Sequence, residues 1–372
     1  MTRDSAGEGD RRTLVERVRF GFYLVEPVAL HDALELGARA EERGFDLVAS
    51  CENLFWWDPG QAPVWDCFTV LATLAERTDR LPLMTNVIDP VKRHPAVVAH
   101  ILATLDNIWP GRFTLGIGPG EIANYGPLVD VSGPPPHRFY TRTREFIEVL
   151  RGVWASTQEE SFSFEGRLFQ VEDAHLSLKP VTEPHPPIYL AALGKRMKQL
   201  TGQVADGWTP VIYTPETYAA DWREVAAAAE AAGRDSRAID RALTVSTVVL
   251  SDENKARAFG DIVGRVMLTT RPQLLRQLGH AELVDERLDV ARTASPMAGV
   301  QLAQQIPAGL GEQVTICGTA EQAIQRIEEF IAAGVRLFVL WPPYEDAEML
   351  EETIEHYSST ILPYFAAGLG NE

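Results

Sequence analysis

The sequence predicts an α/β fold, specifically a (β/α)8 barrel of the TIM-barrel type that carries insertions. Short β-rich runs alternate with longer amphipathic stretches along nearly the whole chain, which is typical of a parallel sheet covered by helices. The chain has 372 residues, and barrels of this kind often reach that length as one domain. Hydrophobic residues make up 45% of the chain, which is enough apolar material for a large core.

The expected strands are the β-rich runs, taken in chain order. Eight are expected, at residues 18–24, 45–50, 81–88, 112–118, 188–193, 206–212, 242–250 and 336–342. Helices are expected between them, at residues 31–43, 68–77, 138–154, 217–232 and 320–333, and in a helix that opens at Pro95. Pro95 suits a first helical turn, because backbone N–H groups in that turn make no hydrogen bond within the helix and proline lacks this group. Gly44 and Gly334 are expected to end the helices that precede them.

Two segments interrupt this alternation and are expected to be insertions, at about residues 155–185 and 253–316. In the first, alternating residues around Glu165-Gly166 predict a β-hairpin outside the barrel. The second is a helical region before the last strand, and insertions of this kind usually cover the active-site end of a barrel. Residues 1–16 are polar and charged, so we expect a disordered N-terminal tail followed by a single domain at 17–372.

Charge and cysteine content argue against several classes of partner. The formal net charge is −18, which repels phosphate backbones and anionic lipid headgroups, so neither nucleic acid nor membrane is expected as a partner. No run reaches the roughly 18 apolar residues that a spanning helix needs. Cys51, Cys67 and Cys317 show no metal-ligand spacing. We therefore expect no metal site, and free thiols in a reducing, cytoplasmic compartment.

Candidate functional segments follow four of the predicted strands, where barrels place their catalytic residues. Residues 116–126 surround Glu121 with glycines whose backbone amides could hold a phosphate, although an ordinary turn has the same pattern. Residues 50–60 hold Glu52 and three aromatic residues on a loop, which indicates a ring-stacking or substrate wall. Residues 85–97 run from a strand end through a proline-containing loop to a helix start, and they could form either part of a functional site or an ordinary turn with capping residues. Small residues in 191–194 precede a helix whose N-terminus would favour phosphate.

Three motifs, taken together, resemble a known family. They are RHPAVVAHILATLDNIWPGRFTLGIGPGEIAN, PPIYLAALGKRMKQLTGQVADGW and GTAEQAIQRIEEFIAAGVRLFVL. In this order the motifs resemble the luciferase-like superfamily of flavin and deazaflavin oxidoreductases, in the branch that contains F420-dependent glucose-6-phosphate dehydrogenase and methylenetetrahydromethanopterin reductase. The resemblance runs from Val18 to about Phe365. It implies hydride transfer between C5 of coenzyme F420, a deazaflavin, and a small organic substrate, with FMN as the alternative cofactor, in a homodimer.

The resemblance also implies roles for individual residues. A cis peptide between Asn86 and Val87 would support the middle ring of the cofactor. Residues expected to contact the cofactor are Cys51, Asn86, Val87, Asp89, Pro119, Gly120, Asn124, Ala192, Leu193 and Gly194. Residues expected to contact the substrate are Trp56, Trp57 and Tyr213. Glu121 matches a carboxylate beside the reacting face and is the first candidate for proton transfer.

The chain departs from the family pattern after the second strand. Where relatives commonly carry Asp-His, this chain has Cys51-Glu52, so proton transfer would fall to Glu121, with Glu52 or Glu26 next. Partial burial in an apolar pocket could bring the pKa of such a carboxylate within reach of neutrality. Basic residues that would hold a sugar phosphate have no clear counterparts, so a phosphorylated sugar is not expected as substrate.

Three alternatives stay open. One is an FMN-dependent luciferase-like monooxygenase, and another is a cofactor-binding barrel without turnover. The third is a phosphate-binding barrel isomerase or aldolase, which lacks a lysine at a strand end for Schiff-base chemistry. The lysines considered for that role fall in loop or helix contexts and are Lys92, Lys179, Lys195 and Lys198.

Overall fold

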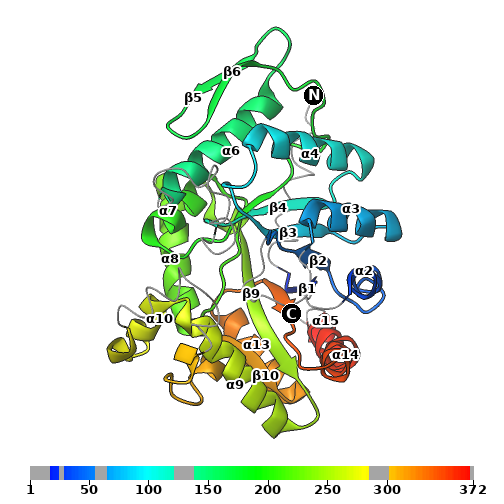
Figure 1. Cartoon of the computed structure of the whole chain (residues 1–372), viewed down its shortest axis with the longest axis vertical. Coiled ribbons are helices and arrows are strands. Elements are labelled where there is room, and N and C mark those ends of the chain that lie inside the picture. Colours follow the sequence, from blue (N-terminus) through cyan, green and yellow to red (C-terminus); the bar gives the residue numbers. More distant parts are fainter. Residues whose placement is uncertain (1–16, 25–28, 55–64, 121–137, 285–300, 369–372) are drawn as a thin grey trace.

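The computed structural model describes residues 17–24, 29–54, 65–120, 138–284 and 301–368. Within these residues, eight parallel strands form a closed barrel with helices around it (Figure 1). The strands are β1 (Arg19–Tyr23), β2 (Leu47–Ser50), β3 (Leu83–Ile88), β4 (Phe113–Ile117), β7 (Ile188–Leu190), β8 (Gly207–Trp208), β9 (Asp240–Val249) and β11 (Leu337–Trp341). They pair in the order β9-β11-β1-β2-β3-β4-β7-β8, and β8 pairs with β9 to close the ring. The predicted (β/α)8 barrel is confirmed.

Most of the predicted helices begin and end close to the expected positions. The α-helices are α2 (Leu30–Ala38), α3 (Cys67–Arg77), α4 (Pro95–Ile108), α6 (Phe139–Ala155), α7 (Lys195–Val204), α8 (Pro215–Ala231), α9 (Glu253–Thr269), α10 (Pro272–Gln277), α13 (Ala320–Ala332), α14 (Ala347–His356) and α15 (Leu362–Gly368). Shorter helical turns are η1 (Ser236–Ala238), η2 (Ala281–Leu283), η3 (Gly311–Val314) and the π-helical η4 (Tyr357–Ile361). Pro95 occupies the first turn of α4, and Gly334 follows α13 with a positive φ angle of 111°, as a helix-ending glycine requires. The helix expected at 31–43 is shorter than predicted, because α2 ends at Ala38 and turns connect it to Gly44, whose φ is 87°.

One strand was not predicted from the sequence. β10 (Thr315–Gly318) pairs in parallel with the far half of β9, from Ser246 to Val249. Ser246 also pairs with Trp341 of β11, so β10 lies on the opposite edge of β9, beyond the end of the short β8. The eight predicted barrel strands are present, and β10 is an additional strand. It pairs there because β9 extends beyond β8 and its free edge has backbone groups that need a hydrogen-bonding partner.

The predicted hairpin lies outside the barrel. β5 (Phe162–Glu165) and β6 (Gln170–Ala174) pair in antiparallel fashion as a separate sheet, which projects beyond α6 in Figure 1. Glu145 of α6 is buried and accepts the N–H groups of Arg167, Leu168 and Phe169 at 3.0, 2.8 and 3.2 Å. This carboxylate therefore fixes the turn of the hairpin to the helix.

Side chains inside the barrel form layers, because successive residues of a strand point alternately to the helices and to the interior. The lowest layer is polar and contains Arg19, Tyr189 and Asp240. Above it lies an apolar layer that includes Leu47, Ala49, Met84, Ala242, Leu337 and Val339. The apolar layer separates the lower ion pair from the mouth formed by the C-terminal strand ends. Among the described residues, no helix has the length and apolar character needed to cross a membrane.

Candidate active site

The mouth of the barrel has one bulky side and one side of small residues. Above the apolar layer, β1 and β11 contribute the half-buried Tyr23 and Trp341, whose ring centroids lie 6.3 Å apart. On β4 and β7 the interior positions are Gly116, Gly118 and Ala191. Sequence reasoning missed the two aromatic residues, although alternation along each strand could have placed them at the mouth. The side of the mouth at β4 and β7 is therefore lined by small residues.

Asn86 spans the interior of the barrel. Its Nδ2 donates to Oγ1 of Thr244 at 2.8 Å, and its Oδ1 accepts from Oγ1 of Thr209 at 3.2 Å. A buried amide needs partners of this kind, so the bonds fix the orientation of Asn86 and tie β3 to the strands across the barrel. Neither threonine was singled out from the sequence. The predicted contact between Asn86 and the cofactor stays a prediction.

The third strand is irregular at its end, as predicted. The peptide between Asn86 and Val87 is cis, and the pairing of β3 with β4 shifts register between Thr85 and Ile88. An added Cβ at Gly116 would lie 2.1 Å from the carbonyl oxygen of Thr85, and one at Gly118 would lie 2.5 Å from Cγ2 of Val87. Both positions therefore need glycine, because the bulged strand packs directly against β4.

Gly116→Ala is expected to destabilise the protein by about 1–3 kcal/mol, the usual effect of overpacking a rigid interior. The colliding atom belongs to the backbone of β3, so it cannot move away by a rotamer change. Urea denaturation measures the free energy of unfolding of the variant and of the wild type. Gly194→Ala is the matched control, because a Cβ there meets no atom within 4 Å and its stability should stay near that of the wild type. Equal stability of all three proteins would contradict this account of the bulge.

The predicted phosphate-binding residues lie on neighbouring strands. Ala191 donates to the carbonyl of Ile117 at 2.9 Å, and Gly120, with a φ of 84°, follows β4. The carbonyl of Ala192 accepts a hydrogen bond from Nε1 of Trp208 at 2.9 Å. Gly194 is exposed and is the N-cap of α7. Pro119 and Leu193 lie half-buried in the same two loops.

The start of α7 has the chemistry of an anion site. The free N–H groups of a helix N-terminus attract negative charge, and Lys195 and Arg196 begin this helix. The guanidinium of Arg196 lies 4.1 Å from the ring centroid of Tyr140 on α6, which holds its charge near the helix end. Together with the backbone beside it, this end of α7 could hold an anionic group such as a phosphate.

Glu52 is enclosed by cations at the end of β2. Its Oε1 accepts from Nε of Arg93, and Nζ of Lys92 lies 3.5 Å from Oε2. Burial raises the pKa of Glu52, while the charges of Lys92 and Arg93 oppose that effect. Next to it, Asn53 donates from Nδ2 to the Cys51 sulfur at 3.4 Å. Glu52 is thus held in ion pairs, which differs from the apolar pocket expected for a proton-transferring carboxylate.

Two further candidates are held by internal contacts. Asp89 is buried and accepts the N–H groups of Val91 and Lys92 at 2.9 and 3.1 Å. Tyr213 is buried, and its hydroxyl donates to Oδ2 of Asp221 at 2.7 Å. The structure therefore gives Tyr213 a packing role beneath the surface. Its contact with substrate, and the contact of Asp89 with cofactor, stay predictions.

Several candidate residues lie outside the described residues. They are Glu26, Trp56, Trp57, Glu121 and Asn124. Their predicted roles stay predictions.

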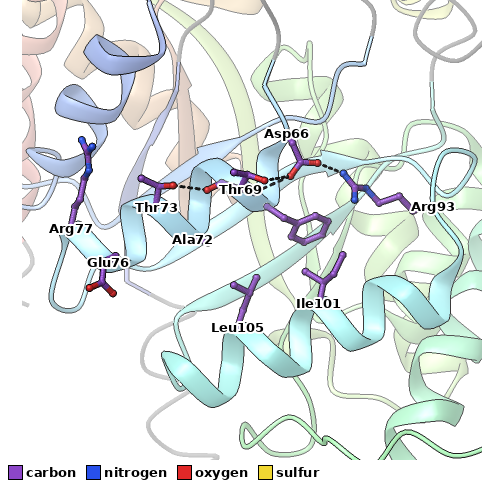
Figure 2. A pocket seen from close by; sticks show the side chains of 10 residues that line it. Asp66, Thr69, Ala72, Thr73, Glu76, Arg77, Arg93, Ile101 and Leu105 are labelled. Atoms are coloured by element: carbon purple, nitrogen blue, oxygen red, sulfur yellow. Dashed lines mark hydrogen bonds and ion pairs between the residues drawn. The ribbon is translucent and has the colours of Figure 1, made fainter.

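A groove of about 750 Å³ lies on the outside of the barrel wall, between α3 and α4. Figure 2 shows lining residues on both helices, with Ile101 and Leu105 on α4 and Thr73 and Glu76 on α3, and with Asp66 and Arg93 at one end. Because it is formed by the outer faces of two helices, the groove is separate from the barrel mouth.

Known proteins share this sequence and architecture. The chain is 29% identical over 357 residues to F420-dependent glucose-6-phosphate dehydrogenase of Microbacterium testaceum, covering 93% of this chain and 97% of the relative. It is 28% identical over 305 residues to 5,10-methylenetetrahydromethanopterin reductase of Methanolobus tindarius, covering 82% and 88%. A solved F420-dependent secondary alcohol dehydrogenase in complex with an F420–acetone adduct aligns with a TM-score of 0.78 at 24% identity, covering 92% and 98%.

A monooxygenase from Streptomyces bottropensis has the same fold, with a TM-score of 0.69 at 22% identity over 93% of this chain and 99% of that one. The luciferase-like monooxygenase family profile matches residues 15–337. This range includes the barrel strands from β1 to β9, with the irregular end of β3 and the start of α7, and it ends at the first residue of β11. The chain therefore belongs to the luciferase-like monooxygenase family.

Proposed function

We propose that this protein is an F420-dependent oxidoreductase that transfers a hydride between the deazaflavin and a small organic substrate. The observation that carries the proposal is the convergence of three features at the barrel mouth. These are the bulged end of β3, the small residues on β4 and β7, and the exposed start of α7. Relatives named as F420-dependent enzymes cover nearly the whole chain, which supports the same cofactor here.

The residues present fit the cofactor. Gly194 faces open space, so a phosphate oxygen could approach the backbone at the start of α7. Gly118 and Ala191 keep the wall of the mouth beside Val87 free of bulky side chains. When bound, F420 would supply a carbon that gives or accepts a hydride. The chain itself would bind and orient the reactants and hold a proton on a carboxylate, for which we propose Glu121.

Buried cations near the strand ends support an uncharged substrate. Nη1 of Arg271 donates to the carbonyls of Val211 and Ile212 at 2.8 and 3.0 Å. Nζ of Lys198 lies 2.6 Å from Asp221 and 3.0 Å from Glu224. These cations are already paired within the protein, so using them to bind a substrate phosphate would leave buried acceptors without a partner. We therefore propose a small, uncharged organic substrate in place of a sugar phosphate.

The test is a parallel titration of the purified protein with oxidised F420 and with FMN, following the fluorescence of each cofactor. We expect micromolar binding of F420 and weaker binding of FMN. Binding of FMN alone would favour the second candidate, an FMN-dependent monooxygenase. The structural similarity to a solved monooxygenase is the reason for considering it. Binding of neither would contradict both.

Gly194→Ala tests the anion site. Its added methyl group would stand between the cofactor phosphate and the backbone, and one lost charge-assisted hydrogen bond is worth about 1.5–3 kcal/mol, or roughly tenfold or more in affinity. The variant should bind F420 more weakly but bind the same deazaflavin without its phosphate tail as the wild type does. An equal effect on both compounds would place the phosphate elsewhere.

The remaining expectations rest on the resemblance and the composition. We propose a homodimer, which light scattering of the purified protein tests. A cytoplasmic location and the absence of nucleic-acid or membrane partners stay predictions.

A further inference from the structure

A cluster of charges joins the ends of β2 and β3. It consists of Glu52, Asp66, Asp89, Lys92 and Arg93, and we call it the Lys92 cluster. Arg93 donates from Nε to Glu52 and from Nη2 to Asp66 at the start of α3, and Figure 2 shows the second contact. The side chains of Glu52, Asp89 and Lys92 are only 7, 5 and 5% exposed, so these three charges lie inside the protein.

Lys92 is the member that contacts both strand ends. Its Nζ lies 2.8 Å from Oδ2 of Asp89, which follows β3. The same ammonium donates to the backbone carbonyl of Glu52 at 2.5 Å and lies 3.5 Å from Oε2 of its carboxylate. Glu52 in turn donates its N–H to the carbonyl of Val87 at 3.4 Å. Lys92 therefore completes a ring of polar contacts between the bulge on β3 and the end of β2.

The chemistry of a lysine suits this position. An ammonium has three N–H donors that point in different directions, and three oxygens surround Nζ here, on Asp89 and Glu52. A planar guanidinium presents its donors in a fixed fork, so arginine would not match the same three acceptors.

Burial and charge act on Glu52 in opposite directions. Burial raises its pKa, Lys92 and Arg93 lower it, and Asp89 raises it. On the side of α3, Glu52 also faces Cys67, whose pKa is raised by burial and by the charges of Glu52 and Asp66. Apart from the two cations, burial and the charge of Asp89 thus disfavour the ionised form of Glu52. Each cation contributes to keeping Glu52 ionised.

We propose that Lys92 is a positioning residue, which locks residues 51–53 against the bulge of β3 and holds Glu52 as a fixed anion. The inference rests on the proposed function, because these two strand ends border the barrel mouth where the cofactor would bind. Glu52 then acts as an anchor for the loop after β2 and does not carry the proton. Proton transfer is left to another group, in agreement with the proposal for Glu121.

Lys92→Met keeps most of the apolar stem of the side chain and removes its charge. Residues linked in one polar network commonly couple by 0.5–3 kcal/mol, so we expect the affinity for oxidised F420 to fall about tenfold. Fluorescence titration with oxidised F420 measures this affinity in the variant and in the wild type. Lys255→Met makes the same chemical change on the exposed face of α9 and should leave the affinity unchanged. Full affinity in Lys92→Met would overturn the positioning role.

The charge of Lys92 also predicts a pH dependence that a simple packing defect would not show. Without Lys92, the pKa of Glu52 in the folded state rises further above its unfolded value, which is about 4.3. Below that value the carboxylate is protonated in both states, so its charge adds nothing to the loss of stability there, which comes from the other contacts of Lys92. As pH rises through the folded pKa, the variant must bury a poorly paired anion and its stability falls relative to the wild type.

Urea denaturation midpoints between pH 4 and pH 9 measure this difference. Lys92→Met also removes the ammonium beside Asp89, which keeps the N–H groups of residues 91 and 92 as donors in either protein. The share of Glu52 is therefore isolated by adding Glu52→Gln to Lys92→Met, which should reduce the pH dependence. An undiminished pH dependence would overturn the fixed-anion role. A loss of stability that is the same at every pH would overturn the fixed-anion role. If the wild type binds neither F420 nor FMN, the proposed function fails, while the pH series still tests the role of the charge.

Discussion

Asp240→Asn is expected to destabilise the folded barrel by about 3–5 kcal/mol, the usual cost of leaving a buried charge without its partner. Nη2 of Arg19 lies 2.5 Å from Oδ2 of Asp240, and their side chains are 9% and 1% exposed. The hydroxyl of Tyr189 donates to the same carboxylate oxygen. The substitution removes the negative charge but leaves the guanidinium under the apolar layer, where water cannot replace the lost partner.

Chemical denaturation of Asp240→Asn against the wild type measures this effect. Glu35→Gln is the matched control, because Glu35 pairs with Arg77 at 3.2 Å on the surface, with side chains 57% and 36% exposed. Surface pairs of this kind contribute about 0–1 kcal/mol. Adding Arg19→Met to Asp240→Asn should restore part of the lost stability, since no unpaired charge then remains. Similar small losses in Asp240→Asn and Glu35→Gln would show that the ion pair is not needed for the fold.

Glu121→Gln is expected to lower the turnover of the F420-dependent reaction by about 10²–10⁴-fold, the usual contribution of a positioned general acid or base. The substitution keeps the size of the side chain and removes its ability to exchange a proton. The affinity for F420 should stay unchanged, because the proposed cofactor contacts are made by the backbone near Gly120 and Gly194. Steady-state kinetics and the fluorescence titration separate these two effects.

Glu159→Gln is the control for Glu121→Gln, because Glu159 is exposed and lies just before the β5–β6 hairpin, outside the barrel. It should show wild-type turnover. Full turnover in Glu121→Gln, with cofactor binding intact, would mean that another group carries the proton. The pH dependence of turnover should then point to that group.

The fold could be predicted because its signals are local. The barrel strands are buried on both faces, so each reads as a continuous β-rich run, as in Leu337–Trp341. Helix starts carry their own markers, such as Pro95 in α4 and the capping boxes at Thr214 and Thr319. β10 escaped prediction because its four residues carry little periodicity, and its pairing depends on how far β9 extends past β8.

The candidate site could be predicted only in part. The motifs placed the irregular end of β3 and the glycines after β4 and β7 at the right strand ends. The partners of Asn86 could not be found in this way, because Thr209 and Thr244 lie 123 and 158 residues further along the chain. The same holds for Lys92, which contacts Glu52 across 40 residues of sequence. No local pattern encodes which polar groups meet inside a closed barrel.

From the sequence alone, the alternation of strands and helices and the family could be established, and the strand ends of the candidate site could be predicted. These features depend on burial patterns and motifs that each segment carries by itself. Closure of the barrel decided the rest. It brought β8 beside β9 and joined Asn86 to two distant threonines. The pairing of β2 with β3 enclosed Glu52 between Lys92 and Arg93. The physical reason is that a buried polar group must find a partner, and that partner is set by which strands become neighbours in space.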